Sequence, residues 1–238
     1  MIQNHHPTVN ILKTGENLGY AEGNNAGIRY AMDRGADYIL VLNNDTLVAP
    51  TMLSKLVSVA ESNPKAGMVG PTMYCTKPVD TLYAAGSFID WKKGKTWNRG
   101  IYEPASNYEN LIQPERVDFI TGCGVLVRRQ LIEEIGILDS TYYLNYEDAE
   151  WCERAHRHGF ETWYMPQAIM WHKDSRSFGS GSPAHIYYLS RNQLLFFWQN
   201  APQHLRWLPV SLILLSHLRT LIAWSLKSEY QSEIYHRR

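Results

Sequence analysis

YILVL at Tyr38–Leu42, followed directly by Asn43-Asn44-Asp45, decides the fold class of this chain. A short, uninterrupted apolar run is typical of a strand buried on both faces, as in the parallel sheets of α/β proteins. Strands and helices alternate around it: we expect strands at Val9–Leu12 and Gly67–Gly70, and helices at Glu22–Arg34 and after Pro50. This alternation predicts an α/β fold with a mostly parallel sheet flanked by helices.

The same domain is expected to continue to about residue 200 of the 238 residues. We expect further strands at Val117–Ile120, Glu161–Tyr164 and Ile169–His172, and helices at Arg129–Ile135, Glu147–His158, Ala184–Asn200 and Gln203–Ser228. A Ser/Gly-rich loop, Lys173–Pro183, follows the last strand. The chain therefore divides into a domain at 1–200 and an amphipathic helical extension at 201–238.

Composition excludes several classes of protein. The 23 basic residues equal the 23 acidic ones, so the net basic charge typical of a nucleic-acid-binding protein is absent. Cys75, Cys123 and Cys152 are too scattered for a disulfide framework or a CxxC zinc site, which favours a reducing, cytoplasmic location. The 8 Trp and 15 Tyr suit a sugar-binding cleft or a membrane interface, although aromatic residues also fill cores.

The extension contains one long apolar segment, Trp207–Trp224, interrupted by Pro209, His217 and Arg219. Five basic residues against two acidic ones give residues 201–238 a charge of +3. Such a helix could lie in a membrane interface or pack on the domain, and the sequence leaves both alternatives open. The N-terminus lacks the basic and apolar regions of a signal peptide.

Asn43-Asn44-Asp45 and His172 are candidate metal ligands. In open α/β sheets ligands bind beyond the carboxyl ends of the strands, where Asp45 is expected to lie. Asn and Asp also favour ordinary turns, so a structural role stays open. His172 ends a predicted strand, and imidazole commonly joins carboxylates around divalent cations such as Mn²⁺, although a lone His is more often structural.

Two further stretches could contribute to a site. Seven acidic residues and no Lys or Arg lie between Glu133 and Glu153. The repulsion among these acids would be relieved by a bound cation or by a raised carboxyl pKa, and a raised pKa is what a general base requires. Acidic residues in the first turn of a helix are also favoured by the helix dipole, so a structural role stays open. The glycines of Asn17–Gly27 would permit close approach of a phosphate to a helix N-terminus, but the stretch is neither GxGxxG nor a P-loop.

In order along the chain, five stretches resemble family 2 glycosyltransferases, which invert the anomeric configuration and have the GT-A nucleotide-sugar fold. The resemblance is greatest to the rhamnosyltransferase-like branch that builds bacterial cell-surface polysaccharides. It covers residues from about 9 to about 200. The matching stretches are NLGYAEGNNAGIRYA at Asn17–Ala31, YILVLNNDTLV at Tyr38–Val48, FITGCGVLVRR at Phe119–Arg129, IGILDSTYYLNYEDAEWCERAHRHGF at Ile135–Phe160 and IMWHKDSRSFG at Ile169–Gly179.

The resemblance implies a role for each matching residue. Asp148 is implied as the general base, with Glu147 as the alternate. Asp45 and His172 are implied as ligands of Mg²⁺ or Mn²⁺, with Asn43 in place of the first Asp of the family's DxD motif. The implied donor contacts are Asn17, Gly19, Asn24, Asn25, Asn43 and Asp45, and the implied acceptor contacts are Gly122, Cys123, Gly124 and Trp151, the last being alternatively a core aromatic.

The implied activity is metal-assisted transfer of a sugar such as rhamnose from a nucleotide-diphosphate sugar to a glycan or lipid-linked acceptor. The expected location is the cytoplasm, at the inner face of the plasma membrane, with peripheral contact through the C-terminal helix. A nucleotidyltransferase would need a basic Gly-rich triphosphate loop near the N-terminus, and the sequence shows none.

Family members have a strand, a helix and a second strand before the stretch that begins here at Asn17. The resemblance therefore implies that this N-terminal βαβ portion is incomplete, which would expose a sheet edge. We accordingly expect weak or absent donor binding by the chain as given. A non-catalytic remnant that binds saccharide or a partner protein is the alternative function.

Overall fold

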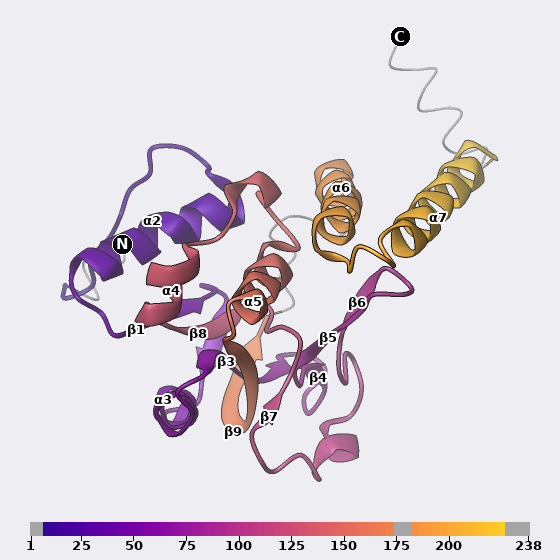
Figure 1. Cartoon of the computed structure of the whole chain (residues 1–238). Helices are drawn as coiled ribbons and strands as arrows, with labels where there is room; N and C mark the ends of the chain where they lie inside the picture. The colour runs from indigo at the N-terminus through magenta and orange to yellow at the C-terminus, as the bar shows by residue number, and fades with distance from the viewer. Residues whose placement is uncertain (1–6, 174–181, 227–238) are drawn as a thin grey trace.

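The computed structural model describes residues 7–173 and 182–226 (Figure 1). Residues 174–181 of the predicted Ser/Gly-rich loop, and residues 227–238 with most of the charges of the extension, lie outside the described part. The main sheet contains β1 (Tyr38–Leu42), β2 (Thr46–Val48), β3 (Ala66–Cys75), β4 (Leu82–Ala84), β7 (Glu115–Arg116), β8 (Gly124–Arg128) and β9 (Glu161–His172). A separate hairpin consists of β5 (Ser87–Asp90) and β6 (Lys95–Asn98).

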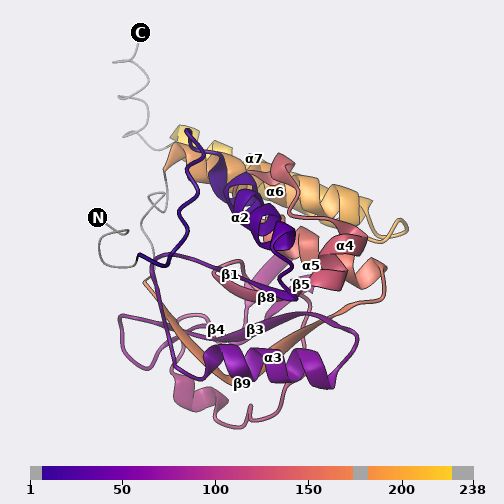
Figure 2. The same cartoon turned by 90° about the vertical axis from the view of Figure 1, so that its left-hand side faces the viewer.

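Helices cover both faces of the main sheet. They are α2 (Gly19–Asp33), α3 (Met52–Ser62), α4 (Arg129–Ile135), α5 (Glu147–Arg157), α6 (Pro183–Asn200) and α7 (Trp207–Leu226), with 3-10 turns η1 (Ala105–Tyr108) and η2 (Ser140–Tyr142). Helix α3 lies on one face and α2, α4 and α5 on the other (Figures 1 and 2). The buried Met52, Leu56 and Val59 give α3 one apolar side, and each contributes about 1.5–3 kcal/mol by leaving water.

The α/β class is confirmed, but the sheet is mixed rather than mostly parallel. The main order is β1-β8-β3-β9-β2, and among the described strands only β3 and β9 pair in parallel. Because β8 is antiparallel to both β1 and β3, these two strands run in the same direction with β8 inserted between them. The predicted strand–helix–strand unit β1–α3–β3 therefore exists, but its two strands are not neighbours.

Two predicted strands are wrong. Val9–Leu12 is exposed and irregular, because no strand of the described part pairs with it. At Val117–Ile120 only Phe119 makes an isolated bridge, to Ser87, while the adjacent Glu115–Arg116 forms β7. The predicted strands Glu161–Tyr164 and Ile169–His172 are joined in one long strand, β9.

Strand β1 lies at an edge of the sheet and pairs with β8 alone among the described strands. Its side chains alternate between half-buried and buried, and its last residue, Leu42, is exposed. The expectation that an N-terminal βαβ portion is incomplete is not tested by this arrangement and stays a prediction.

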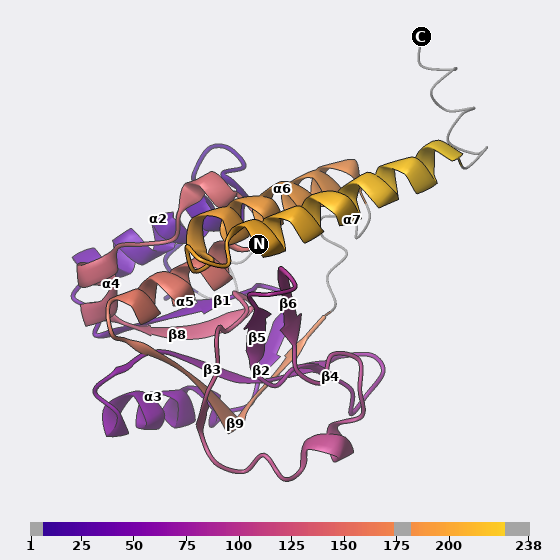
Figure 3. The same cartoon turned by 45° about the vertical axis from the view of Figure 1, so that its right-hand side comes forward.

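Helices α6 and α7 pack side by side on the face that also carries α2 and α5, and α7 extends beyond the rest of the domain (Figure 3). The segment Trp207–Ser225 is long and apolar enough to cross a membrane by length and composition, and 17% of it is buried. Val210 and Ile213 face the domain, whereas Leu214, Leu218 and Leu221 are half or more exposed. The turn of the β5–β6 hairpin lies beneath α7, where Gly94 approaches Ile213.

Candidate active site

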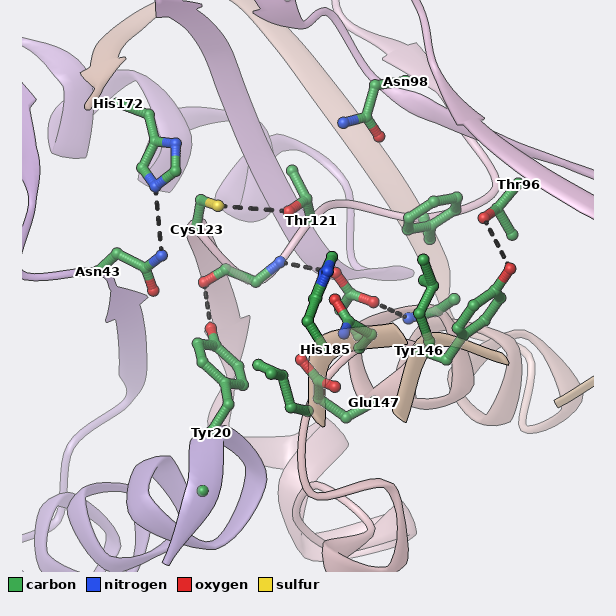
Figure 4. Close-up of a pocket in the computed structure, with 18 of the residues that line it drawn as sticks. Tyr20, Asn43, Thr96, Asn98, Thr121, Cys123, Tyr146, Glu147, His172 and His185 are labelled. Carbon is green, nitrogen blue, oxygen red and sulfur yellow. Dashed lines mark hydrogen bonds between the residues drawn. The ribbon is translucent and has the colours of Figure 1, made fainter. Parts of the chain in front are cut away.

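A cavity of about 570 Å³ opens where the carboxyl end of β1, the turn before β8, the N-terminus of α5 and the end of β9 meet (Figure 4). Most of the residues singled out in the sequence line this cavity. They are Asn17, Gly19, Asn43, Asp45, Gly122, Cys123, Glu147, Asp148 and His172.

Strand pairing brings Asp45 and His172 together. Thr46 of β2 pairs with His172 of β9, which places the preceding Asp45 Oδ1 3.4 Å from His172 Nε2. Asn43 Nδ2 lies 3.5 Å from the same nitrogen. His172 is 3% exposed, and Asp45 Oδ1 is buried without a hydrogen-bond partner among the described residues. A carboxylate, an imidazole and amide oxygens are together ligands that suit Mg²⁺ or Mn²⁺.

This donor set is small. The described residues contain no group of three or more His, Cys, Asp and Glu side chains placed to hold a metal ion. Asp45 and His172 would therefore supply only part of a coordination shell, with the other ligands coming from amide oxygens, water or a bound substrate. The pair fits a cation that arrives with an anionic ligand better than a permanently bound structural metal.

Asp148 is fixed on the floor of the cavity by two backbone amides. Gly122 N–H donates to its Oδ2 at 2.9 Å and Ala149 N–H donates to its Oδ1 at 2.7 Å. Burial raises the pKa of the Asp148 carboxyl, although these two hydrogen bonds favour the ionised form. The raised pKa and fixed orientation suit a general base.

Glu147 lies beside Asp148 and is 4% exposed. Its Oε2 is buried without a hydrogen-bond partner among the described residues. Burial, and secondly the negative charge of Asp148, raise the pKa of Glu147 well above its ordinary value. The two carboxyls therefore differ in their surroundings, because the amides of Gly122 and Ala149 hold Asp148, whereas Oε2 of Glu147 lacks a hydrogen-bond partner among the described residues.

The other acids of the Glu133–Glu153 stretch mostly have partners. Arg129 pairs with Glu133, and Arg154 pairs with Glu150 through Nη2 at 2.8 Å. The cluster is thus divided: arginines pair with Glu133 and Glu150, while the pKa values of Glu147 and Asp148 are raised mainly by burial and not, as the sequence suggested, by repulsion within the cluster.

The loop before α5 is strained. Tyr143, Asn145 and Tyr146 have φ values of 59°, 67° and 71°, in the left-handed region that costs non-glycine residues of the order of 1 kcal/mol each. The fully buried Asn192 of α6 holds this loop, since its Nδ2 lies 2.6, 2.7 and 2.8 Å from the carbonyls of Tyr142, Leu144 and Asn145. Helix α6 therefore fixes the loop that precedes α5, and with it the position of the α5 N-terminus at the cavity.

Replacing Asn192 by Ala is expected to lower the free energy of unfolding by about 2–3 kcal/mol, because it leaves buried carbonyls without a donor and opens a small cavity. Urea denaturation followed by tryptophan fluorescence measures the change. Asn107, which is exposed, provides the matched Asn→Ala control. Equal stability of the two variants would show that Asn192 does not hold the loop.

The N-terminus of α2 is not available for a phosphate, contrary to the expectation from its glycines. Tyr20 N–H and Ala21 N–H both donate to the carbonyl of Tyr143, at 2.8 and 3.1 Å, and Gly19 N–H donates to Asn17 Oδ1 at 3.0 Å. Gly19 itself has φ +74°, and a Cβ there would clash with the Tyr143 ring. The glycine therefore permits close packing of the Tyr143 loop instead of a ligand.

Four sequence-predicted residues lie outside the cavity. Asn24 Nδ2 donates to the Tyr20 carbonyl within α2. Asn25, which is 1% exposed, exchanges hydrogen bonds with the backbone of Leu138 in both directions. Gly124 pairs with Leu42 and leaves room for Met170. Trp151 is 2% exposed and donates to the Gly136 carbonyl, so it is a core aromatic and not a sugar-stacking wall.

The structure also brings residues to the cavity that the sequence did not single out. Tyr20 donates a hydrogen bond from its hydroxyl to the carbonyl of Gly122, and so supports the floor under Asp148. The others are Tyr83, Thr96, Asn98, Phe119, Thr121, Leu144, Asn145, Tyr146, Ala149, His185 and Leu189, whereas Asn44 belongs to the Asn43-Asn44-Asp45 stretch that the sequence did indicate. For Thr96 and Asn98 the local signal was the alternation along β6, which turns both side chains inward.

Comparison with known sequences finds glycosyltransferases both among family models and among individual relatives. A family model described as "Glycosyltransferase like family 2" matches residues 1–208. The chain is 30% identical to the N-acetylglucosaminyl-diphospho-decaprenol L-rhamnosyltransferase of Mycobacterium tuberculosis, with 90% of this chain and 76% of the relative covered. It is 26% identical to the dTDP-rhamnosyl transferase RfbF of Shigella flexneri, with 81% of this chain and 64% of the relative covered.

Solved structures have a similar fold at low sequence identity. GalNAc-T7 with UDP, GalNAc and Mn²⁺ matches with a TM-score of 0.62 and 15% identity, over 82% of this chain and 38% of that chain. The mannosyltransferase PcManGT from Pyrobaculum calidifontis, in complex with GDP-Man and Mn²⁺, matches with a TM-score of 0.52 and 14% identity, over 96% of this chain and 67% of that chain. At these identities the similarity concerns the fold alone.

Proposed function

The chain belongs to glycosyltransferase-like family 2, and on that premise we propose that it transfers a sugar from a nucleoside-diphosphate donor to a glycan or lipid-linked acceptor of cell-surface polysaccharide synthesis. The observation that carries the proposal is the presence of the Asp45–His172 pair and the Asp148 carboxyl in one cavity. The names of two relatives make rhamnose the first donor sugar to test and a diphospho-polyprenol the first acceptor carrier.

The charge of the cavity supports a need for a divalent cation. Asp45, Glu147 and Asp148 line it, whereas no Lys or Arg is present among its described lining residues. A diphosphate would meet only negative charge there without a metal ion. Asp45 and His172 would hold that ion together with the diphosphate oxygens, and the solved neighbours carry Mn²⁺ with UDP or GDP-Man. When bound, the cation neutralises the charge that develops on the leaving diphosphate.

Residues of the chain itself would activate the acceptor and hold the cavity in shape. Asp148 accepts the proton of the attacking acceptor hydroxyl, since its carboxylate faces the cavity and its pKa is raised toward the working pH. The new glycosidic bond forms on the face opposite the leaving group, so the anomeric configuration inverts. Tyr20 and Gly122 hold the floor in place while the positive charge on the sugar ring develops. Glu147 is the alternate base.

Transfer is tested with dTDP-rhamnose and N-acetylglucosaminyl-diphospho-polyprenol in the presence of Mn²⁺, with product detected by mass spectrometry. Because the sequence predicts weak donor binding, the donor is used at millimolar concentration. Rhamnosylated acceptor is the expected product, and other nucleotide sugars serve to test the donor. Donor hydrolysis without transfer to any acceptor would contradict the proposal.

We propose in addition that α7 rests on the cytoplasmic face of the membrane. Leu214, Leu218 and Leu221 of this helix are half or more exposed, and residues 201–226 carry Arg206 and Arg219 but no acid. Arg206 lies over the ring of Trp198, which contacts Trp207, and such a basic and aromatic cluster suits the lipid headgroup region. All three cysteines are free, in keeping with a reducing compartment.

Cosedimentation with vesicles of phosphatidylcholine and phosphatidylglycerol tests this contact. Replacing Leu214, Leu218 and Leu221 together by Glu is expected to lower vesicle binding more than a hundredfold, because each buried Leu contributes about 1.5–3 kcal/mol. Leu53→Glu, at an exposed position of α3, is the control and should bind like the wild type. A wild-type chain that stays in the supernatant would refute membrane contact.

A further inference from the structure

The cavity has a second end, formed by β6 and α6. Figure 4 shows Thr96, Asn98 and Tyr146 on one side of the cavity and Asn43 and His172 on the other. We propose that this second end binds a neutral, hydroxylated sugar ring of the acceptor, a proposal that rests on the glycosyl transfer proposed above. The site, called the β6 subsite, consists of Thr96, Asn98, Tyr146 and His185.

A chain of contacts places the general base between the two ends. Asn43 N–H donates to the Cys123 carbonyl at 3.0 Å, and the adjacent Gly122 N–H donates to Asp148. Beyond Asp148, Tyr146 Oη lies 3.5 Å from Thr96 Oγ1 of β6. In an inverting displacement the nucleophile attacks opposite the leaving group. With the diphosphate at Asp45 and His172, the acceptor must therefore enter from the β6 side, where Asp148 can reach its hydroxyl.

The β5–β6 hairpin presents two polar side chains to this space, and the Thr96 hydroxyl already contacts Tyr146 Oη there. Thr96 and Asn98 alternate along β6 with the exposed Lys95 and Trp97, so the two polar side chains face the cavity together. Ser87 Oγ donates to Asn98 Oδ1 at 2.9 Å, which fixes the amide. The NH₂ group of Asn98 has no hydrogen-bond partner among the described residues, and it is available to a ligand.

The chemistry of the β6 subsite suits a sugar better than a phosphate. Its members are hydroxyl, amide and imidazole groups, without a Lys or Arg to balance an anion. The neighbouring Phe119 and Leu189 add apolar surface against which a sugar ring can pack. Sugar hydroxyl and acetamido groups both donate and accept hydrogen bonds, as these side chains do.

The hairpin is held rigidly to the C-terminal helices. Gln193 Nε2 of α6 donates to the Gly94 carbonyl at 2.8 Å, and Gly94 packs against Ile213 of α7. Trp91, three residues before Gly94 in the same turn, stacks on Phe196 with ring centroids 5.5 Å apart. This fixation positions Thr96 and Asn98 before the acceptor binds, which lowers the entropic cost of binding.

Asn98→Asp and Thr96→Val test the subsite with little change of shape. Asn98→Asp keeps an acceptor for Ser87 Oγ and removes the NH₂ donors, and Thr96→Val removes the hydroxyl alone. With N-acetylglucosaminyl-diphospho-polyprenol as acceptor and dTDP-rhamnose as donor, each change is expected to raise the acceptor KM about tenfold. The donor KM should stay unchanged. Thr96→Ser restores the hydroxyl and should restore the acceptor KM.

Lys95→Ala, on the opposite face of the same strand, is the matched control. An unchanged acceptor KM in both Asn98→Asp and Thr96→Val would overturn the β6 subsite while leaving transfer by the wild type intact. An equal rise in donor KM would also overturn it, because the hairpin would then act on the whole cavity. A wild type without any transfer would contradict the proposed function, and the subsite with it.

Discussion

Replacing Asp148 by Asn is expected to lower the transfer rate by about 10²–10⁴-fold, which is the usual contribution of a general base. The amide cannot accept the proton of the acceptor hydroxyl. Donor binding should be nearly intact, since Asp45 and His172 are unchanged. Single-turnover kinetics with labelled donor, together with donor calorimetry, separate the two quantities.

Stability must be measured in the same variant. Asp148 accepts from the amides of both Gly122 and Ala149, and the NH₂ group of an Asn would face one of these donors. The loss of this hydrogen bond is expected to lower the free energy of unfolding by about 1–3 kcal/mol. Glu147→Gln is the comparison, because it neutralises the neighbouring carboxyl without disturbing these amides. Substantial turnover by Asp148→Asn, with loss of turnover in Glu147→Gln, would assign the base to Glu147 instead.

The acid side of the pH–rate profile provides a second check on the same carboxyl. Burial raises the pKa of Asp148, so the base becomes protonated at a higher pH than an exposed Asp would. The transfer rate of the wild type should therefore fall on acidification at a higher pH than it would with an exposed Asp as the base. This acidic limb should vanish from the residual activity of Asp148→Asn.

Replacing Asp45 and His172 together by Ala is expected to abolish the dependence of donor binding on Mn²⁺. The two side chains form the polar pair at the carboxyl end of β1 and β9, and the remaining described lining of the cavity holds no Lys or Arg to bind a diphosphate. Donor affinity with Mn²⁺ should fall about a hundredfold or more, toward the value of the wild type without metal.

Calorimetric titration of nucleotide sugar with and without Mn²⁺ measures this effect. His158→Ala provides a control, because His158 is an exposed histidine on another element. Metal dependence equal to that of the wild type in the double variant would show that the cation, if it binds, is held elsewhere.

The core of the fold could be predicted from the sequence because its signals are local. YILVL formed strand β1, and Arg129–Ile135 formed α4 with the bounds expected. The direction of β8 could not be predicted, because an apolar strand reads the same whether its neighbours are parallel or antiparallel. Where a strand lies in a sheet depends on contacts far apart in the sequence.

Part of the site could also be predicted, because several of its residues carry local sequence signals. Asp45, Asp148 and His172 stand at ends of expected elements, and the structure brings them to one cavity. Trp151 is an aromatic residue of the kind that lines sugar-binding sites. Its place on α5, however, turns its ring into the core, where it donates a hydrogen bond to the Gly136 carbonyl. Thr96 and Asn98 come from a hairpin outside the main sheet, and only the tertiary packing against α6 and α7 places them at the cavity.

The anomeric configuration of the transferred sugar tests the central claim most directly. The chain is incubated with Mn²⁺, dTDP-rhamnose and N-acetylglucosaminyl-diphospho-polyprenol, and NMR assigns the new glycosidic bond. A single carboxylate base opposite a metal-bound leaving group predicts a product with the configuration opposite to that of the donor, formed by the wild type and lost in Asp148→Asn. A product that retains the configuration of the donor, or no product with any nucleotide sugar, would contradict this account.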